Sequence, residues 1–202
     1  YVEEVTDLSE YISGRRNRLF QLEDGRLIIS DGNKPFLVSK DNGATWEEEK
    51  YPWLSKLEEA DSYIVDIAIG ADFTTALVIG RMEGDEYIQE GLVIRADGTE
   101  IPMEMPSADT YPRAVGVSDE GRVFVGMNGD NIYEVKEDGS CELYLTVPNG
   151  TPSFIQIRDG LLMIDGTSYE TILFYDIEKE EYAEKDEALN GFIKEYYNGG
   201  NK

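Results

Sequence analysis

The sequence contains no histidine, and only one cysteine stands among its 202 residues. Without histidine, Ser-His-Asp and Cys-His catalysis and histidine-ligated zinc or iron sites are excluded. With Cys141 alone, no disulfide can form within these residues. Cys141 begins a predicted outer strand, where a single thiol is more often a packing group than a nucleophile.

Positive charge and long apolar runs are also scarce. No apolar run reaches the roughly eighteen residues that a membrane-spanning helix needs, so we expect no membrane insertion. There are 18 lysines and arginines against 42 aspartates and glutamates, for a formal charge of −24. Such a surface repels phosphate backbones, which excludes nucleic acid as an expected partner. The acidity favours solubility and leaves calcium open, although the EF-hand spacing is absent; we expect no other cofactor.

The composition is that of a folded globular chain, with 41% hydrophobic and 30% charged residues. The 20 glycines and 13 tyrosines, together with short apolar runs, favour many strands joined by tight turns. We expect a single domain over residues 1–202. The chain begins at Tyr1 without an export signal, so we expect a processed mature chain or an excised fragment.

Turn signals of one kind recur at intervals of roughly 40 to 50 residues, which is the period of propeller blades. They divide the chain into four units, at residues 18–50, 63–105, 113–146 and 153–185. Each unit reads as four strands. The predicted strands are 18–23, 26–30, 36–40 and 45–50; 63–70, 74–80, 91–96 and 99–105; 113–118, 122–126, 131–137 and 141–146; and 153–158, 161–165, 171–176 and 181–185.

Hydrophobic patterning supports this division. The second strands are nearly continuous apolar runs, such as Leu27–Ile29 and Val123–Val125, which suits strands covered on both faces by neighbouring blades. The fourth strands are the most polar, which suits outer edges protected by charge. The sequence therefore predicts an all-β fold of about four antiparallel blades. An irregular antiparallel sandwich with the same turn residues is the alternative.

Three segments stand apart from the four units. Residues 54–60 are predicted to form a short surface helix that covers an edge. Residues 1–13 and 190–202 are terminal segments. Two alternatives are open for these terminal segments. Tyr1–Val5 adds an outer strand to the last blade and closes the ring, or Phe192–Tyr197 begins a fifth blade.

One short motif carries a family resemblance. Residues 39–46 read S-x-D-x-G-x-T-W, with fixed residues Ser39, Asp41, Gly43, Thr45 and Trp46. This motif resembles the Asp-box of sialidase-type (BNR-repeat) β-propellers. The Asp41 carboxylate is expected to accept backbone N–H groups of its own turn, and Gly43 to adopt a conformation that side chains disfavour. Trp46 is expected to pack as a large apolar group between adjacent sheets.

The resemblance implies a β-propeller, either a complete small ring or part of a larger one. It also implies that the Asp-box joins the third and fourth strands of a blade, on the face opposite the ligand. The ligand face is then formed by the loops entering each innermost strand and those joining the second and third strands. The candidate ligand-binding residues in these loops are Arg15, Arg16, Trp53, Arg81, Tyr111, Arg113, Asn128, Asp130 and Tyr169.

The leading hypothesis is a non-catalytic binding or scaffold module on the outside of a bacterial cell that engages a glycan or a protein. No catalytic residues are expected, because no acid and base constellation is visible. One alternative is a sialidase-like hydrolase fragment. For this the resemblance implies three arginines that bind a carboxylate, with a tyrosine and glutamate pair and an aspartate for the chemistry. Arg18, Arg81 and Arg113 are the arginines near that face. The other is an assembly factor with a protein partner. An incomplete ring would predict a homodimer through exposed blade faces.

Overall fold

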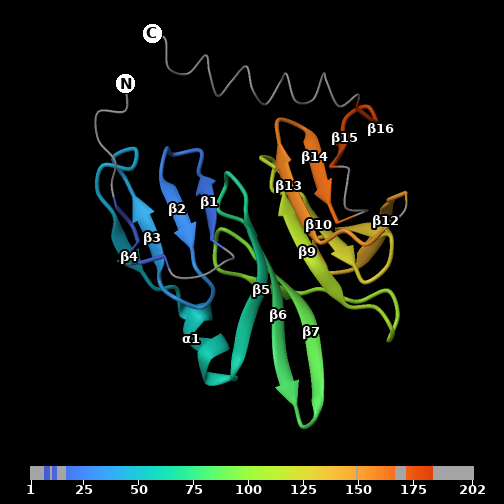
Figure 1. Cartoon of the computed structure of the whole chain (residues 1–202), viewed down its shortest axis with the longest axis horizontal. Helices are drawn as coiled ribbons and strands as arrows, with labels where there is room; N and C mark the ends of the chain where they lie inside the picture. Colours follow the sequence, from blue (N-terminus) through green and yellow to red (C-terminus); the bar gives the residue numbers. More distant parts are fainter. Residues whose placement is uncertain (1–6, 10, 13–16, 149, 167–171, 184–202) are drawn as a thin grey trace.

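Four antiparallel sheets of four strands each make up the β-structure of the described residues (Figure 1). The computed structural model describes residues 7–9, 11–12, 17–148, 150–166 and 172–183. In each sheet the strands pair in chain order. The sheets are β1 (Arg18–Gln21), β2 (Leu27–Ser30), β3 (Phe36–Ser39) and β4 (Glu47–Glu49); β5 (Ser62–Ile69), β6 (Thr75–Glu83), β7 (Glu86–Ile94) and β8 (Glu100–Pro102); β9 (Pro112–Val117), β10 (Val123–Met127), β11 (Asn131–Val135) and β12 (Cys141–Thr146); and β13 (Phe154–Arg158), β14 (Leu161–Asp165), β15 (Leu173–Asp176) and β16 (Glu181–Tyr182).

These sheets are the blades of a β-propeller, which confirms the predicted fold class. The first strands of successive blades, β1, β5, β9 and β13, lie next to one another at the centre. Each pair of consecutive blades encloses its own hydrophobic core, because a single sheet cannot cover both of its apolar faces. Strand β10, buried along its whole length between two such cores, is the continuous apolar strand that the sequence predicts.

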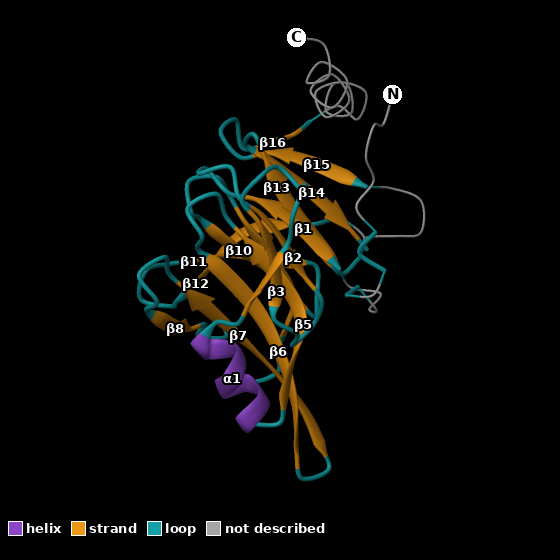
Figure 2. Ribbon diagram, turned by 90° about the vertical axis from the view of Figure 1, so that its left-hand side faces the viewer, coloured by secondary structure: helices purple, strands orange, loops and turns teal. Residues whose placement is uncertain are grey.

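One predicted loop is strand instead. Residues 81–90 were expected to connect the second and third strands of the second blade, but β6 and β7 continue through them to a two-residue turn at Gly84 and Asp85. Gly84 has φ +65°, which suits a tight hairpin turn. The resulting hairpin extends beyond the neighbouring strands (Figures 1 and 2).

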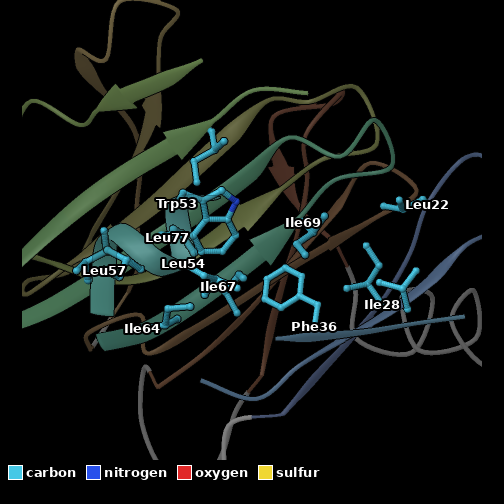
Figure 3. Close-up of a cluster of buried hydrophobic side chains, with 13 residues drawn as sticks. Leu22, Ile28, Phe36, Trp53, Leu54, Leu57, Ile64, Ile67, Ile69 and Leu77 are labelled. Carbon is cyan, nitrogen blue, oxygen red and sulfur yellow. The ribbon is translucent and has the colours of Figure 1, made fainter. Parts of the chain in front are cut away.

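The predicted surface helix is present as α1 (Pro52–Glu59). Proline at its start costs no hydrogen bond, since the first helical N–H groups have no partner within the helix. Trp53, Leu54 and Leu57 share one face and are buried against the core between the first two blades (Figure 3). No helix in the described part of the chain is long and apolar enough to cross a membrane.

The Asp-box residues form the expected turn between β3 and β4. One Asp41 oxygen accepts the Thr45 backbone N–H at 2.8 Å, and the other accepts the Thr45 hydroxyl at 2.6 Å. Asn42 and Gly43 have φ values of 59° and 91°, so the backbone is left-handed at both positions. The Ser39 hydroxyl accepts the Gly43 N–H at 2.8 Å.

Trp46 differs from its expected role between adjacent sheets. It is half-buried and belongs to none of the three core clusters. Its indole N–H donates to the Gly43 carbonyl at 3.0 Å, so the ring folds back over its own turn. The strands predicted at Tyr1–Val5 and Phe192–Tyr197 lie outside the described residues, and the closure of the ring stays a prediction.

Candidate functional site: the central cavity

A cavity of about 950 Å³ opens at the centre of the propeller. All four inner strands, or the residues that lead into them, contribute to its wall, together with strand β7 and the loop before β9. Consecutive strands of a blade run in opposite directions. The cavity, at the end where the chain enters the inner strands, is therefore opposite the end that contains the Asp-box turn between β3 and β4. The lining residues are Asn17, Arg18, Val65, Asp66, Tyr87, Ile88, Gln89, Ala108, Thr110, Tyr111, Arg113, Ser153 and Phe154.

An ion pair at the floor of the cavity connects the four inner strands. Arg18 of β1 donates to Asp66 of β5 at 2.6 Å. The second Asp66 oxygen accepts the backbone N–H of Val115, on β9, at 3.0 Å. Arg18 also donates to the Ile155 carbonyl of β13 at 3.3 Å, and its guanidinium lies 4.4 Å from the ring centre of Phe154.

Burial disfavours the charged form of the Arg18 side chain, and the nearby carboxylate of Asp66 favours it. The two side chains are 15% and 12% exposed. Burial lowers the pKa of Arg18, while the charge of Asp66 and its hydrogen bond act to raise it. The guanidinium nevertheless stays protonated, since an arginine is not deprotonated under these conditions. Both groups are therefore occupied with each other and with the backbone.

Two β-bulges shape the wall of the cavity. In β5 the register shifts between Ile64 and Asp66, so that Val65 is the additional residue. In β9, Pro112 and Ala114 pair with consecutive residues of β10, so that Arg113 is the additional residue. A bulge redirects side chains relative to the regular alternation of a strand. Another bulge, between β11 and β12, lies on an outer strand and does not contribute to the cavity.

Arg113 is exceptional among the cations that the structure describes. The other described lysines and arginines pair with carboxylates, apart from Arg95, which donates to the Gly121 carbonyl at 3.2 Å. Arg113 makes neither an ion pair nor a hydrogen bond to any described residue, and it is exposed. With Arg18 and Asp66, it gives the lining residues a formal charge of +1 in a chain of −24.

The structure brings two of the predicted ligand contacts into this cavity, Tyr111 and Arg113. Asn128 is bonded to the loop that contains the first of them: its side chain accepts the Tyr111 N–H at 3.0 Å and donates to the Asp109 carbonyl at 3.0 Å. Asn128 therefore orders the loop and is not a lining residue. Asp130 is exposed, lies outside the cavity wall, and accepts the Val147 N–H at its carbonyl.

Two other predicted positions do not lie on the rim. Trp53 is 6% exposed and packs against Phe36, because α1 turns its apolar face into the core. Arg81 lies on the hairpin, where it pairs with Glu90 and with Glu83. Arg15, Arg16 and Tyr169 lie outside the described residues. Contact with a ligand stays a prediction for every residue of the set.

Sequence reasoning missed Asp66, Tyr87 and Gln89 as cavity residues. Asp66 interrupts an otherwise apolar inner strand, and an acidic residue at such a position was a signal that its carboxylate has a partner. Tyr87 and Gln89 lie in β7, within residues 81–90, for which the sequence predicts a loop. Arg18 was named only among the arginines near that face.

The described residues form neither a metal-binding cluster nor a reactive thiol. No group of three or more histidine, cysteine, aspartate or glutamate side chains is placed there to hold a metal ion. Burial, followed by the nearby charge of Glu104, raises the pKa of Cys141 to about 11, so its thiol is protonated at neutral pH. The calcium prediction stays untested.

No family model matches the sequence, and no curated protein matches it either. Among solved structures, the chain is similar to a luciferin-regenerating enzyme, with 12% identity, a TM-score of 0.51, and coverage of 86% of this chain and 62% of that one. It is also similar to a putative gluconolactonase (14% identity, TM-score 0.50, 81% and 60% coverage) and to a streptogramin B lyase (16%, 0.50, 83% and 53%).

In each case the chain spans less than two thirds of the length of the similar structure. At such low identity the similarity concerns the path of the backbone and not the residues of a site. What these comparisons show of the chain is its fold, that of a β-propeller.

Proposed function

We propose that this propeller is a non-catalytic binding module that holds an acidic group of its ligand against Arg113 in the central cavity. The observation that carries the proposal is that Arg113 has no hydrogen-bond or ion-pair partner among the residues that the structure describes. In an acidic protein with abundant carboxylates, the other described arginines pair with carboxylates, apart from Arg95, which donates to a backbone carbonyl. A guanidinium held apart from them by a bulge is available to a carboxylate of another molecule.

The remaining lining residues suit recognition better than chemistry. Tyr87 and Tyr111 are 47% and 38% exposed and offer flat apolar surfaces, while Asn17, Gln89 and Thr110 offer hydrogen-bonding groups. Among the described lining residues Asp66 has the one acidic side chain, and it already accepts bonds from Arg18 and Val115. The described lining residues therefore lack the pair of carboxylates that most glycoside hydrolases use.

The hydrolase alternative gains no support from the described residues. Arg18 and Arg113 line the cavity, but Arg81 does not, and Arg18 is occupied by Asp66. The set of arginines that the sialidase resemblance implies is thus not assembled by these three. Placement outside the cell rests on the Asp-box resemblance, and we keep it as part of the proposal.

The test uses ligand probes in matched pairs that differ only in a carboxylate. We expect glucuronate-containing oligosaccharides, or peptides with a free C-terminus, to bind better than the neutral sugars or the C-terminal amides. Replacing Arg113 by glutamine should weaken binding of the acidic form by about tenfold or more, because a charge-assisted hydrogen bond contributes about 1.5–3 kcal/mol. Titration calorimetry measures both differences.

Lys40→Gln is the control, since Lys40 occupies a variable position of the Asp-box, on the opposite face, and pairs with Glu49 at 3.2 Å. This variant should bind the acidic probes as well as the parent protein does. Equal affinity for the acidic and neutral members of every pair would refute the proposal, as would an Arg113→Gln protein that binds normally.

A further inference from the structure

Beside the cavity, at Gln89, strand β7 has no partner strand on its outer side among the described residues. Strand β8 pairs with β7 only from Leu92 to Ile94, and the Met103 N–H donates to the Gly91 carbonyl at 2.9 Å. Gly91 therefore directs its backbone toward β8. Two residues earlier in the same strand, Gln89 directs its backbone toward the same side. No described strand pairs with β7 there.

This edge lies at the wall of the cavity. Residues Tyr87, Ile88 and Gln89 line the cavity that also contains Arg113. A strand added beside Gln89 would consequently run along the cavity mouth. Unpaired strand edges recognise extended polypeptide backbones, because the ladder of N–H and C=O groups is common to all peptides.

The exposed face of the hairpin offers apolar contacts to such a strand. Met82 and Tyr87 are cross-strand partners and are 58% and 47% exposed. Side chains of an added strand alternate between its two faces, so the side chains on one face would lie on the same side of the sheet as Met82 and Tyr87. Both residues are large and apolar, while the neighbouring Glu83 and Glu86 are charged.

Three other outer strands in the described part of the chain, β4, β8 and β12, offer less suitable edges for pairing. Strand β4 presents three consecutive glutamates, and β8 is three residues long and ends in Pro102. Strand β12 carries a bulge against β11. The edge at Gln89 has neither a proline nor a bulge, since the register of β6 and β7 is regular throughout the hairpin.

We propose that an extended segment of a partner protein adds to β7 as a further strand at Gln89 and places an acidic side chain or its C-terminal carboxylate against Arg113. This inference rests on the proposed function, because it names the partner class of the same cavity. The charges favour a foreign segment over a second copy of this chain. Self-pairing would bring the carboxylates of Glu83, Asp85 and Glu86 of two hairpins together.

The experiment selects binders from a displayed library of random octapeptides with free C-termini, using the whole chain as the target. Affinities of synthetic copies are then measured by fluorescence anisotropy. Gln89→Pro removes the N–H that faces the open edge but leaves the β6 ladder intact, because that N–H takes no part in it. Gln89→Ala removes only the side chain and serves as its matched control.

We expect Gln89→Pro to weaken peptide binding by about tenfold, and Gln89→Ala to change it by less than about threefold. Because Gln89→Pro could also disturb the hairpin, the selected peptides are N-methylated one position at a time and tested on the parent protein. Losses of affinity at every second position indicate strand addition. Losses at no position would overturn the inference.

The outcomes separate this inference from the proposed function. If peptides bind and depend on Arg113 but tolerate Gln89→Pro and N-methylation, the cavity function stands and strand addition is wrong. If no peptide is selected while the acidic sugars bind, strand addition is again wrong. A concentration-dependent dimer that Gln89→Pro abolishes, measured by light scattering, would assign the edge to a second copy and overturn the proposal.

Discussion

At the scale of single residues, the Asp-box shows how one carboxylate organises a turn. Asp41 accepts hydrogen bonds from the Thr45 hydroxyl, the Thr45 backbone N–H and the Ser39 hydroxyl. These bonds, with the Thr45 hydroxyl as the largest contribution, hold the pKa of Asp41 below its ordinary value of 3.8. The turn therefore depends on an ionised Asp41.

We expect the Asp-box turn to loosen in acid. Because the pKa of Asp41 is lower in the folded chain than in the unfolded chain, its stabilising contribution is complete above the ordinary carboxyl pKa and is lost as the pH falls through the folded value. Nuclear magnetic resonance follows this through the Thr45 amide and the Trp46 indole N–H, from about pH 6 to about pH 2.5.

The two resonances should move together, with a midpoint below 3.8. Asp41→Asn is the control, and its signals should not titrate in this range. A midpoint at or above the ordinary carboxyl value in the parent protein would show that the hydrogen bonds do not favour the ionised form.

At the scale of elements, glycine sets how closely adjacent blades approach. A methyl group added to Gly116, on β9, would lie 2.5 Å from the Ile155 side chain of β13. A side chain at this position would push the inner strands of the third and fourth blades apart. The same blade contains Gly129, in the loop between β10 and β11, where an added methyl group would have nothing within 4 Å.

We therefore expect Gly116→Ala to lower the free energy of unfolding by about 1–3 kcal/mol, as overpacking in a core does. Gly129→Ala should leave it nearly unchanged. Urea unfolding followed by circular dichroism compares the two variants with the parent protein. Equal stability of Gly116→Ala and the parent would indicate that the two blades are not packed at the closeness described.

At the scale of the whole molecule, the Arg18 and Asp66 pair connects blades that are distant in sequence. Its hydrogen bonds join the inner strands β1, β5, β9 and β13, so this one pair connects all four sheets. Removal of one partner from a mostly buried pair leaves the other charge uncompensated, which is costlier than loss of the attraction itself.

Asp66→Ala should accordingly lower the free energy of unfolding by about 3–5 kcal/mol. The exposed pair of Asp24 and Arg26, with side chains 54% and 31% exposed, is the control, and Asp24→Ala should cost less than about 1 kcal/mol. Thermal and urea unfolding measure both. A similar, small effect of the two substitutions would show that the central pair does not hold the blades together.

Much of the fold could be predicted because turn chemistry and hydrophobic patterning are local. Asp-Gly pairs and apolar runs placed strands at all four blades, and the Asp-box motif specified a turn made within eight residues. The hairpin at 81–90 was missed although Gly84-Asp85 is a local turn signal. Its charged residues favoured a loop, and the pairing of β6 with β7 outweighed that preference.

The cavity could be predicted only in part, for a physical reason. The sequence by itself determined the blades, the acidic charge and the end of the propeller at which the entering loops meet. Only the tertiary structure decided that Trp53 is buried, that Asp66 occupies Arg18, and that bulges redirect Arg113. Bulges and ion pairs depend on the register between strands far apart in the chain, and no local pattern of residues encodes that register.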